Sequence, residues 1–321
     1  MNSTLLETQI AIKYIKDNFE RLLAKKLNLT RVSAPLFVEK STGLNDDLSG
    51  VEESVNFTLD GKRIEIVHSL AKWKRNALRE YGFAPYTGLY TDMNAIRKDE
   101  HLDRLHSIYV DQWDWEKVIL RKDRNKEYLF QTVKEIYSVI KKLANMAREK
   151  WSHTYFLPKS IFVISSSELE ALYPTLSTKE REREITKKHG AVFLYQIGWP
   201  LPSGVAHDAR AADYDDWKLN GDILLYDEVI EDSLEISSMG IRVDGHSLRE
   251  QLEFKGELSK LDNPYCKAVT SGVLPLTIGG GIGQSRLCMY FLKKRHIGEV
   301  QSSYWPKEMK DALIAEGLEI L

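Results

Sequence analysis

Short β-rich runs recur along this 321-residue chain, and several are joined by turns too tight for a regular alternation of strands and helices. Residues 55–59 and 63–67 form two such runs around an Asp-Gly pair, which is a strong signal for a two-residue hairpin. The runs at 89–96 and 107–116 are joined by a short charged loop. Because parallel strands need a long crossover, these hairpins predict an antiparallel β-sheet flanked by helices, an α+β fold.

Amphipathic segments predict the helices around this sheet. The first spans Thr4 to Leu27, and its Thr4 and Glu7 have the spacing of a capping box. The segment Arg31–Val38 has a strand-like composition, but its internal Pro35 restricts it to a sheet edge or an interface. The other expected helices cover 69–81, 129–147, 178–189, 246–255 and the residues after 283, and the other expected strands cover 161–164, 191–197, 222–226, 233–243 and 277–283.

Composition narrows the class of protein. The formal net charge is −2, whereas a dedicated nucleic-acid binder usually carries a basic excess. The two cysteines, Cys266 and Cys288, lack the spacing of a zinc site or a disulfide framework and are expected to be buried thiols. No apolar run approaches the ~18 residues of a membrane span, and the N-terminus lacks a signal-peptide pattern. These two absences lead us to expect a cytoplasmic protein. No linker or repeat divides the sequence, so we expect a single domain over residues 1–321.

The common nucleotide-binding and hydrolase signatures are missing from the sequence. There is no GxxxxGK(S/T) P-loop, no GxGxxG after an early strand, and neither HExxH nor GxSxG. Polar-rich islands remain instead, among them 45–50, 208–217 and 235–242. A nucleotide would therefore have to be held by arginines in two further islands, around Arg97 and Arg286.

The segment 109–116 alternates two kinds of side chain. As a strand it would carry Gln112, Asp114 and Glu116 on one face, and Asp111 with two tryptophans on the other. Three polar groups in a row indicate either a polar pocket lined by the sheet or a solvated sheet face. The tryptophans make the strand costly to expose, which favours the pocket.

The run Gly279–Gly283 leaves most of a strand without side chains. Glycine in a strand often marks the close approach of a ligand or another backbone. A flat adenine could lie on this strand while Arg286 stacks on its other face or meets a phosphate. The alternative is a glycine-rich β-bulge followed by a surface arginine.

Three blocks resemble the motifs of class II aminoacyl-tRNA synthetases. The first helix and the strand with Pro35 resemble motif 1, Arg97 with the strand at 111–116 resembles motif 2, and 281–286 resembles motif 3. The chain also resembles asparagine synthetase A, the aspartate–ammonia ligase family, in six longer segments: HSLAKWKR, YVDQWDWE, DYDDW, NGDIL, SSMGIRVD and GGGIGQSR. This resemblance implies that L-aspartate, ammonia and ATP are converted through a β-aspartyl adenylate into L-asparagine, AMP and pyrophosphate.

The resemblance also implies roles for individual residues at the nucleotide. Arg97 would contact the α-phosphate, and Arg286 would contact the γ-phosphate or the adenine face. Glu235 matches a position that holds Mg²⁺ between phosphates, and the alternative is a paired structural carboxylate. The residues implied to hold ATP and Mg²⁺ are Arg97, Gly281, Gly283, Arg286, Glu235, Ser238 and, as a weaker metal candidate, Asp222.

The amino-acid end of the site resembles the aspartate-recognition segment of aspartyl-tRNA synthetase, through Ser69 and Lys74. Here the side-chain carboxylate must be activated, so Lys74 is inferred to hold the α-carboxylate, together with Arg242. Asp46 is our choice as the base that deprotonates ammonium, and the alternative is a loop-capping Asp before Ser49-Gly50. The substrate-binding set is Ser69, Lys74, Asp114, Ser237 and Arg242, and the catalytic set is Asp46, Arg97, Gln112 and Arg286.

Three other functions compete with this interpretation. A tRNA synthetase would normally need an anticodon-binding module, and a non-catalytic relative would be expected to lose Arg97, Glu235 or Arg286. A glutamine-dependent amidotransferase would need a cysteine glutaminase domain. Motif 1 implies a homodimer with Arg31–Val38 near the interface and no tRNA partner. The segment 198–205 matches no motif that we can interpret.

Overall fold

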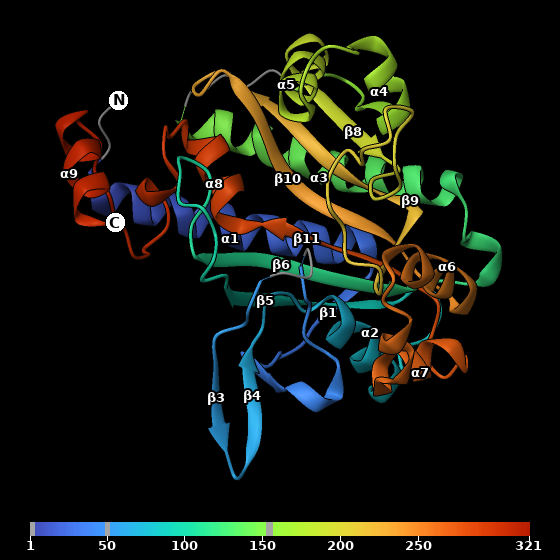
Figure 1. Ribbon diagram of the computed structural model, residues 1–321. Coiled ribbons are helices and arrows are strands. Elements are labelled where there is room, and N and C mark those ends of the chain that lie inside the picture. The colour runs from blue at the N-terminus through green and yellow to red at the C-terminus, as the bar shows by residue number, and fades with distance from the viewer. Residues whose placement is uncertain (1–3, 49–51, 152–156) are drawn as a thin grey trace.

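A computed structural model describes residues 4–48, 52–151 and 157–321. It is built on a sheet of eight strands in the order β1-β5-β6-β11-β10-β9-β8-β7 (Figure 1). The five central pairings are antiparallel, and the two outermost, β1 with β5 and β7 with β8, are parallel. The strands are β1 (Leu29–Arg31), β5 (Gly88–Ile96), β6 (Tyr109–Val118), β7 (Phe162–Ser165), β8 (Ala191–Tyr195), β9 (Asp215–Asp227), β10 (Asp232–Arg242) and β11 (Thr277–Gly283).

Helices cover both faces of this sheet. One face packs on α1 (Leu5–Leu27), α3 (Lys126–Trp151) and α8 (Gln284–Leu292), and this layer holds the largest apolar cluster. The fully buried Trp113 and Trp115 of β6 point into it. The predicted alternation along β6 is therefore confirmed, and its polar side chains fall on the opposite face. The other helices are α2 (Ala71–Glu80), α4 (Ser166–Leu172), α5 (Thr178–His189), α6 (Gly245–Lys255), α7 (Pro264–Thr270) and α9 (Lys307–Ala315).

The ends of the helices follow their local sequence. The Glu7 N–H donates to Thr4 Oγ1 at 3.2 Å and the Thr4 N–H donates to the Glu7 carboxylate at 2.8 Å, so the predicted capping box forms. Gly190 ends α5 with φ of 74°, a conformation that glycine adopts at little cost. No helix in the described ranges is long and apolar enough to span a bilayer.

A smaller sheet projects from the body of the molecule (Figure 1). It contains β2 (Phe37–Glu39), β3 (Asn56–Leu59) and β4 (Lys62–Ile66), in the order β2-β4-β3. Asp60 and Gly61 join β3 to β4 with φ of 50° and 75°, as the predicted Asp-Gly hairpin requires.

Several elements differ from the sequence-based expectation. The single strand expected over Arg31–Val38 is wrong: the chain leaves the large sheet after Arg31, passes Pro35, and enters the small sheet at Phe37. Proline lacks the N–H that a continuous ladder needs, which explains the break. The helices α4, α7 and α9, and the start of β9 at Asp215, are not predicted from the sequence pattern.

Candidate active site

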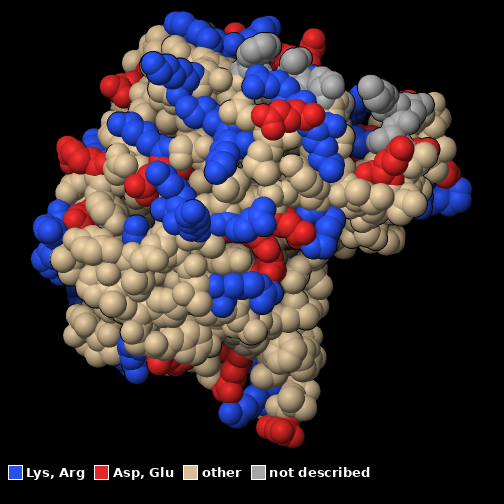
Figure 2. All heavy atoms as spheres, turned by 180° about the vertical axis from the view of Figure 1, so that it is seen from behind, with Lys and Arg blue, Asp and Glu red and all other residues tan. Residues whose placement is uncertain are grey.

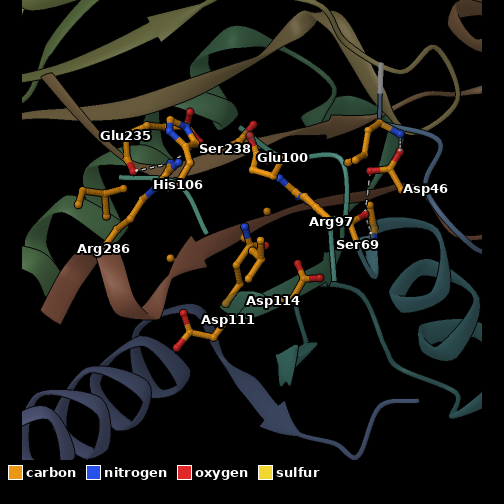
Figure 3. Close-up of a pocket in the computed structure, with 18 of the residues that line it drawn as sticks. Asp46, Ser69, Arg97, Glu100, His106, Asp111, Asp114, Glu235, Ser238 and Arg286 are labelled. Atoms are coloured by element: carbon orange, nitrogen blue, oxygen red, sulfur yellow. Dashed lines mark hydrogen bonds and ion pairs between the residues drawn. The ribbon is translucent and has the colours of Figure 1, made fainter. Parts of the chain in front are cut away.

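The polar face of the large sheet lines a cavity of about 300 Å³. Figure 3 shows that its side chains form two groups. Glu235, Ser238, His106 and Arg286 lie together at one end, and Asp46 with Ser69 lies at the other. Arg97 and Glu100 lie between the two groups, above Asp111 and Asp114. The cavity can thus hold an elongated ligand with different chemistry at its two ends.

The glycine strand β11 forms the floor of this cavity. It pairs with β6 on one side and β10 on the other in unbroken register, so it is a central strand and the bulge alternative is wrong. A Cβ at Gly281 would collide with Gln112 Oε1, and one at Gly279 would collide with the Glu116 carboxylate. Only glycine leaves room for these polar groups on the floor.

A β-bulge in β10 brings Glu235 and Ser238 onto the cavity face. Residues three apart on a regular strand point to opposite faces. Between Glu235 and Ser237, however, the register against β9 shifts by one residue, so that Glu235 opposes Leu224 and Ser238 opposes Asp222. Leu224 and Asp222 share a face, and therefore Glu235 and Ser238 do as well.

The acidic end of the cavity is surrounded by cations. Arg286 Nη1 lies 3.6 Å from Glu235 Oε1 and donates to the Glu235 carbonyl at 3.2 Å. Burial opposes ionisation of Glu235, but Arg286, Arg210 and Lys179 hold the pKa of its carboxyl below the usual value. Asp222, buried beside Ser238 and paired with Arg210, has its pKa raised to about 7 by burial. One of its carboxylate oxygens lacks a hydrogen-bond partner among the described residues.

Arg97 and Arg286 both face the cavity and are only partly buried. Within the described part of the chain, the Arg97 guanidinium makes only weak hydrogen bonds, from two nitrogens that lie 3.4 Å from the His68 carbonyl oxygen. A guanidinium held so loosely is available to bind an anionic ligand. The structure thus brings both predicted arginines to one cavity.

Asp46 closes the other end of the cavity. Its carboxylate accepts hydrogen bonds from Ser69 Oγ at 3.0 Å and from the Leu48 N–H at 2.9 Å. The second bond is a loop cap, as the alternative interpretation of Asp46 expects, while its role as a base stays a prediction. Ser49 and Gly50 lie outside the described residues. Burial raises the pKa of Asp46, while the neighbouring Lys72 acts in the opposite direction.

A buried charge network lies beside the cavity, on the same face of the sheet. Arg242 donates to the Glu116 carboxylate at 2.8–3.1 Å and pairs with Asp215, while Lys74 pairs with Asp114. Burial disfavours the charge on Glu116, but Arg242 and Lys74 hold the pKa of its carboxyl below the usual value. Arg242 and Asp114 reach the cavity surface, and so the network fixes two groups that a ligand would meet.

Three predicted site residues lie off the cavity surface. Lys74 is fully buried, and its ammonium already binds Asp114 and the carbonyls of Trp115 and Gly280. Ser237 opposes Ile223 and Ile282, which belong to the apolar core, so its hydroxyl faces away from the cavity. Asp222 lies behind Arg210 and does not line the cavity. The predicted residues that do line it are Asp46, Ser69, Arg97, Gln112, Asp114, Glu235, Ser238, Arg242, Gly281, Gly283 and Arg286.

The sequence reasoning missed several residues of the cavity wall. The segment 198–205 anchors part of this wall, because Trp199 packs edge-on against Trp217 with ring centroids 5.0 Å apart. The chain then enters the polar island 208–217, for which the sequence pattern indicates no role. The missed lining residues with polar or charged side chains include Glu100, His106, Asp208, Arg210, Tyr214 and Gln301.

The fold and the site define a class. The chain has the fold of class II aminoacyl-tRNA synthetases, as in asparaginyl-tRNA synthetase from Pyrococcus horikoshii complexed with asparaginyl-adenylate, at a TM-score of 0.68 and 16% identity over 93% of this chain and 70% of that one. The Entamoeba histolytica asparaginyl-tRNA synthetase complexed with the same adenylate gives 0.66 and 13%, over 93% and 68%.

Within this class, the chain belongs to the AsnA family, the aspartate–ammonia ligases, whose family model matches residues 6–317. The aspartate–ammonia ligase of Bacillus cytotoxicus (strain DSM 22905 / CIP 110041 / 391-98 / NVH 391-98) is 58% identical over 320 residues, which is 99% of this chain and 98% of that protein. The ligase of Bacillus cereus (strain B4264) is 57% identical over the same shares. The chain is therefore a ligase, and the expected family and fold are confirmed.

Proposed function

We propose that this protein makes L-asparagine from L-aspartate, ammonia and ATP, releasing AMP and pyrophosphate. The observation that carries the proposal is the family match over almost the whole chain, combined with a cavity whose two ends differ in chemistry. The end around Arg286 and Glu235 suits a nucleotide with its phosphates, and the end around Asp46 and Ser69 suits aspartate and ammonia. Membership in the family, and not the fold, separates this reaction from tRNA aminoacylation.

The first step activates a carboxylate that is otherwise a poor electrophile. A side-chain oxygen of aspartate attacks the α-phosphorus of ATP, the bond to the β-phosphate oxygen breaks, and pyrophosphate leaves with the electron pair. Arg97, which is loosely held, stabilises the charge that develops on the α-phosphate. Arg286, beside the glycine floor with Gly281 and Gly283, holds the remainder of the nucleotide.

Magnesium fits the acidic end by the chemistry of its side chains. Glu235 and Ser238 share the cavity face and offer oxygen ligands, which Mg²⁺ prefers. Asp222 would support them from the neighbouring strand, since one of its oxygens has no partner in the described structure. The ion would neutralise charge on the phosphates. Arg286 would bind the polyphosphate directly through its positive charge, and Glu235 would hold the metal ion beside it. Arg286 Nη1 and Glu235 Oε1 are 3.6 Å apart.

The amino-acid end must hold the α-carboxylate and the α-amino group away from the reacting carboxylate. Arg242 is the buried guanidinium that lines this part of the cavity, and Asp114 and Gln112 offer acceptors for an ammonium group. Lys74 would not contact the substrate itself. Its buried ammonium binds Asp114 and positions that carboxylate. Ser69 keeps Asp46 in place through its 3.0 Å hydrogen bond.

The second step forms the amide. Asp46 takes one proton from ammonium, and the resulting ammonia attacks the side-chain carbonyl carbon of the adenylate. The bond between that carbon and the phosphate oxygen breaks, AMP leaves with the electron pair, and the nitrogen loses a second proton to water. A raised pKa suits Asp46 for this role, because a stronger base accepts a proton from ammonium more readily.

We also propose that the enzyme is a cytoplasmic homodimer that acts without tRNA. A homodimer follows from the motif 1 resemblance, with β1 and the adjacent turn at Pro35 near its interface. A cytoplasmic enzyme without a tRNA partner agrees with the formal net charge of −2. On the face seen in Figure 2, basic side chains are scattered with acidic ones among them, and a broad lower area has few charged groups. Light scattering at micromolar concentration tests the dimer.

A product assay tests the proposed reaction. Purified protein is incubated with ATP, Mg²⁺, L-aspartate and ammonium, and asparagine, AMP and pyrophosphate are quantified. We expect equal amounts of the three, and no sustained release of any of them when aspartate or ammonium is omitted. Glutamine in place of ammonium should give no asparagine. If the protein aspartylates tRNA and forms no free asparagine, the proposal is wrong.

A further inference from the structure

A second cavity, of about 240 Å³, lies between the small sheet and helices α2 and α7. Residues of β4 line one side, and Lys72 of α2 and Asn263 at the start of α7 line the other. Asp46 lines both this cavity and the main one. The group proposed to deprotonate ammonium therefore stands between two separate spaces.

The second cavity has the chemistry of a cation site. Its carboxylates are Asp46, Asp47, Glu52, Glu53 and Glu65, and its cations are Lys40, Arg63 and Lys72. The cations are paired within the protein, and so are several of the carboxylates: Asp47 with Lys260 at 3.0 Å, and Glu53 with Arg63 and Lys98 at 3.4 Å. Lys72 Nζ lies 2.8 Å from Asp213, Arg63 Nε lies 3.2 Å from Glu65, and Lys40 Nζ lies 3.6 Å from Glu65.

His68 adds an independent indication of a ligand. It lines the second cavity, is only 1% exposed, and its Nδ1 bonds the Asp46 carbonyl oxygen at 3.0 Å. Its Nε2 is buried and has no hydrogen-bond partner among the described residues. A buried imidazole nitrogen normally has a partner, which leaves this one available to a small polar molecule.

We infer that this second cavity, the ammonium chamber, admits ammonium to the reaction from the side opposite the nucleotide. The inference rests on the proposed function, and it adds a route and a binding space for one substrate. Ammonia is needed only after the adenylate has formed, when the main cavity already holds a large ligand. Ammonium is close to water in size, so a chamber of this volume accommodates it easily. Carboxylates outnumber cations in its lining, five to three, which favours ammonium over the anionic ATP and aspartate.

Two variants of the chamber test the inference. Ser54→Leu places an apolar side chain in the chamber wall, and Glu65→Gln removes a carboxylate from it. Neither residue lines the main cavity. Glu39→Gln is the matched control, because Glu39 lies in the same small sheet, pairs with Lys62 and lines neither cavity. Each protein is assayed for the KM of ammonium, and for aspartate-dependent exchange of pyrophosphate into ATP without ammonium.

We expect the KM for ammonium to rise about tenfold in the two chamber variants, and the exchange rate to remain that of the wild type. The control should match the wild type in both assays. Folded chamber variants with an unchanged ammonium KM, or with exchange reduced as much as amide formation, overturn the inference. Should Ser54→Leu not fold, Glu53→Gln replaces it, since Glu53 lines the same chamber and is 63% exposed. Absence of exchange in the wild type would instead contradict the proposed function.

Discussion

Glu235 and Ser238 lie three residues apart on β10 and nevertheless point into the same cavity, because the register of β10 against β9 shifts by one residue between them. In a regular strand one of the two would face the apolar core. The shift therefore creates a pair of oxygen ligands that the sequence pattern alone does not reveal. The same shift turns Ser237, which is also a predicted site residue, towards the apolar core.

Gly281→Ala should strongly reduce activity. The added Cβ would overlap Gln112 Oε1, and because β6 and β10 hold the strand on both sides, the Gln112 side chain would have to leave its position at the floor. We expect a stability loss of about 1 kcal/mol, the low end for overpacking, because a flexible side chain can move. We expect kcat to fall about tenfold or more, because Gln112 is displaced from the cavity. Urea unfolding and steady-state kinetics measure the two effects. Gly245→Ala, whose Cβ would lie 3.3 Å from Thr270 Cα, is the milder control, and equal kinetic losses would contradict the account.

Arg97→Ala should lower kcat roughly 100-fold, as loss of a transition-state donor does. Arg286→Ala should mainly raise the KM for ATP, and Arg286→Lys should restore little, because a lysine lacks the planar fork. Arg183→Ala is the surface control, since its side chain is 42% exposed. Steady-state kinetics with varied ATP separate these effects, and a wild-type kcat in Arg97→Ala would contradict the proposed role.

Amide formation should depend on the ionisation of Asp46. Burial raises its pKa above the usual aspartate value, so the carboxylate required as a base is lost at a higher pH than for an exposed aspartate. The rate should fall as the pH falls through this raised pKa. Asp46→Asn should lose most amide formation and keep pyrophosphate exchange. The ratio of wild-type to variant rates is measured across pH, which cancels the change in free ammonia. A ratio that is flat with pH would contradict the assignment.

Glu116→Gln should destabilise the protein by about 3–5 kcal/mol, because it leaves the fully buried Arg242 and Lys74 without their shared carboxylate. The folded-state pKa of Glu116 is lowered, so its contribution is present above the unfolded-state pKa of about 4.3 and is lost as pH falls through the folded value. Wild type and variant should therefore converge in acid. Urea unfolding at neutral and acidic pH checks this, and an equal difference at both would contradict it.

Local signals in the sequence predicted much of the fold. The Thr4 capping box, the Asp-Gly hairpin and the alternation along β6 depend on neighbouring residues, and all three are confirmed. The break at Pro35 was misjudged because two different sheets receive the strands on its two sides. Which sheet a strand joins depends on pairing partners that are far apart in the sequence, and the local pattern contains no information on these partners.

The site was predicted less completely than the fold. Residues on the cavity face of regular strands, such as Gln112, were placed correctly by alternation. Lys74 and Ser237 were not, because the depth of Lys74 depends on packing with Asp114 and the direction of Ser237 depends on the shifted register. The wall formed by Arg210 and its neighbours belongs to an irregular loop, where neither helical nor strand periodicity applies.

An isotope measurement tests the central claim, that the side-chain carboxylate of aspartate is adenylated. L-Aspartate carrying ¹⁸O in that carboxylate is converted with ATP and ammonium, and the products are analysed by mass spectrometry. The account predicts one ¹⁸O in the phosphate of AMP for each asparagine formed. Unlabelled AMP, or label in inorganic phosphate released together with ADP, would contradict it.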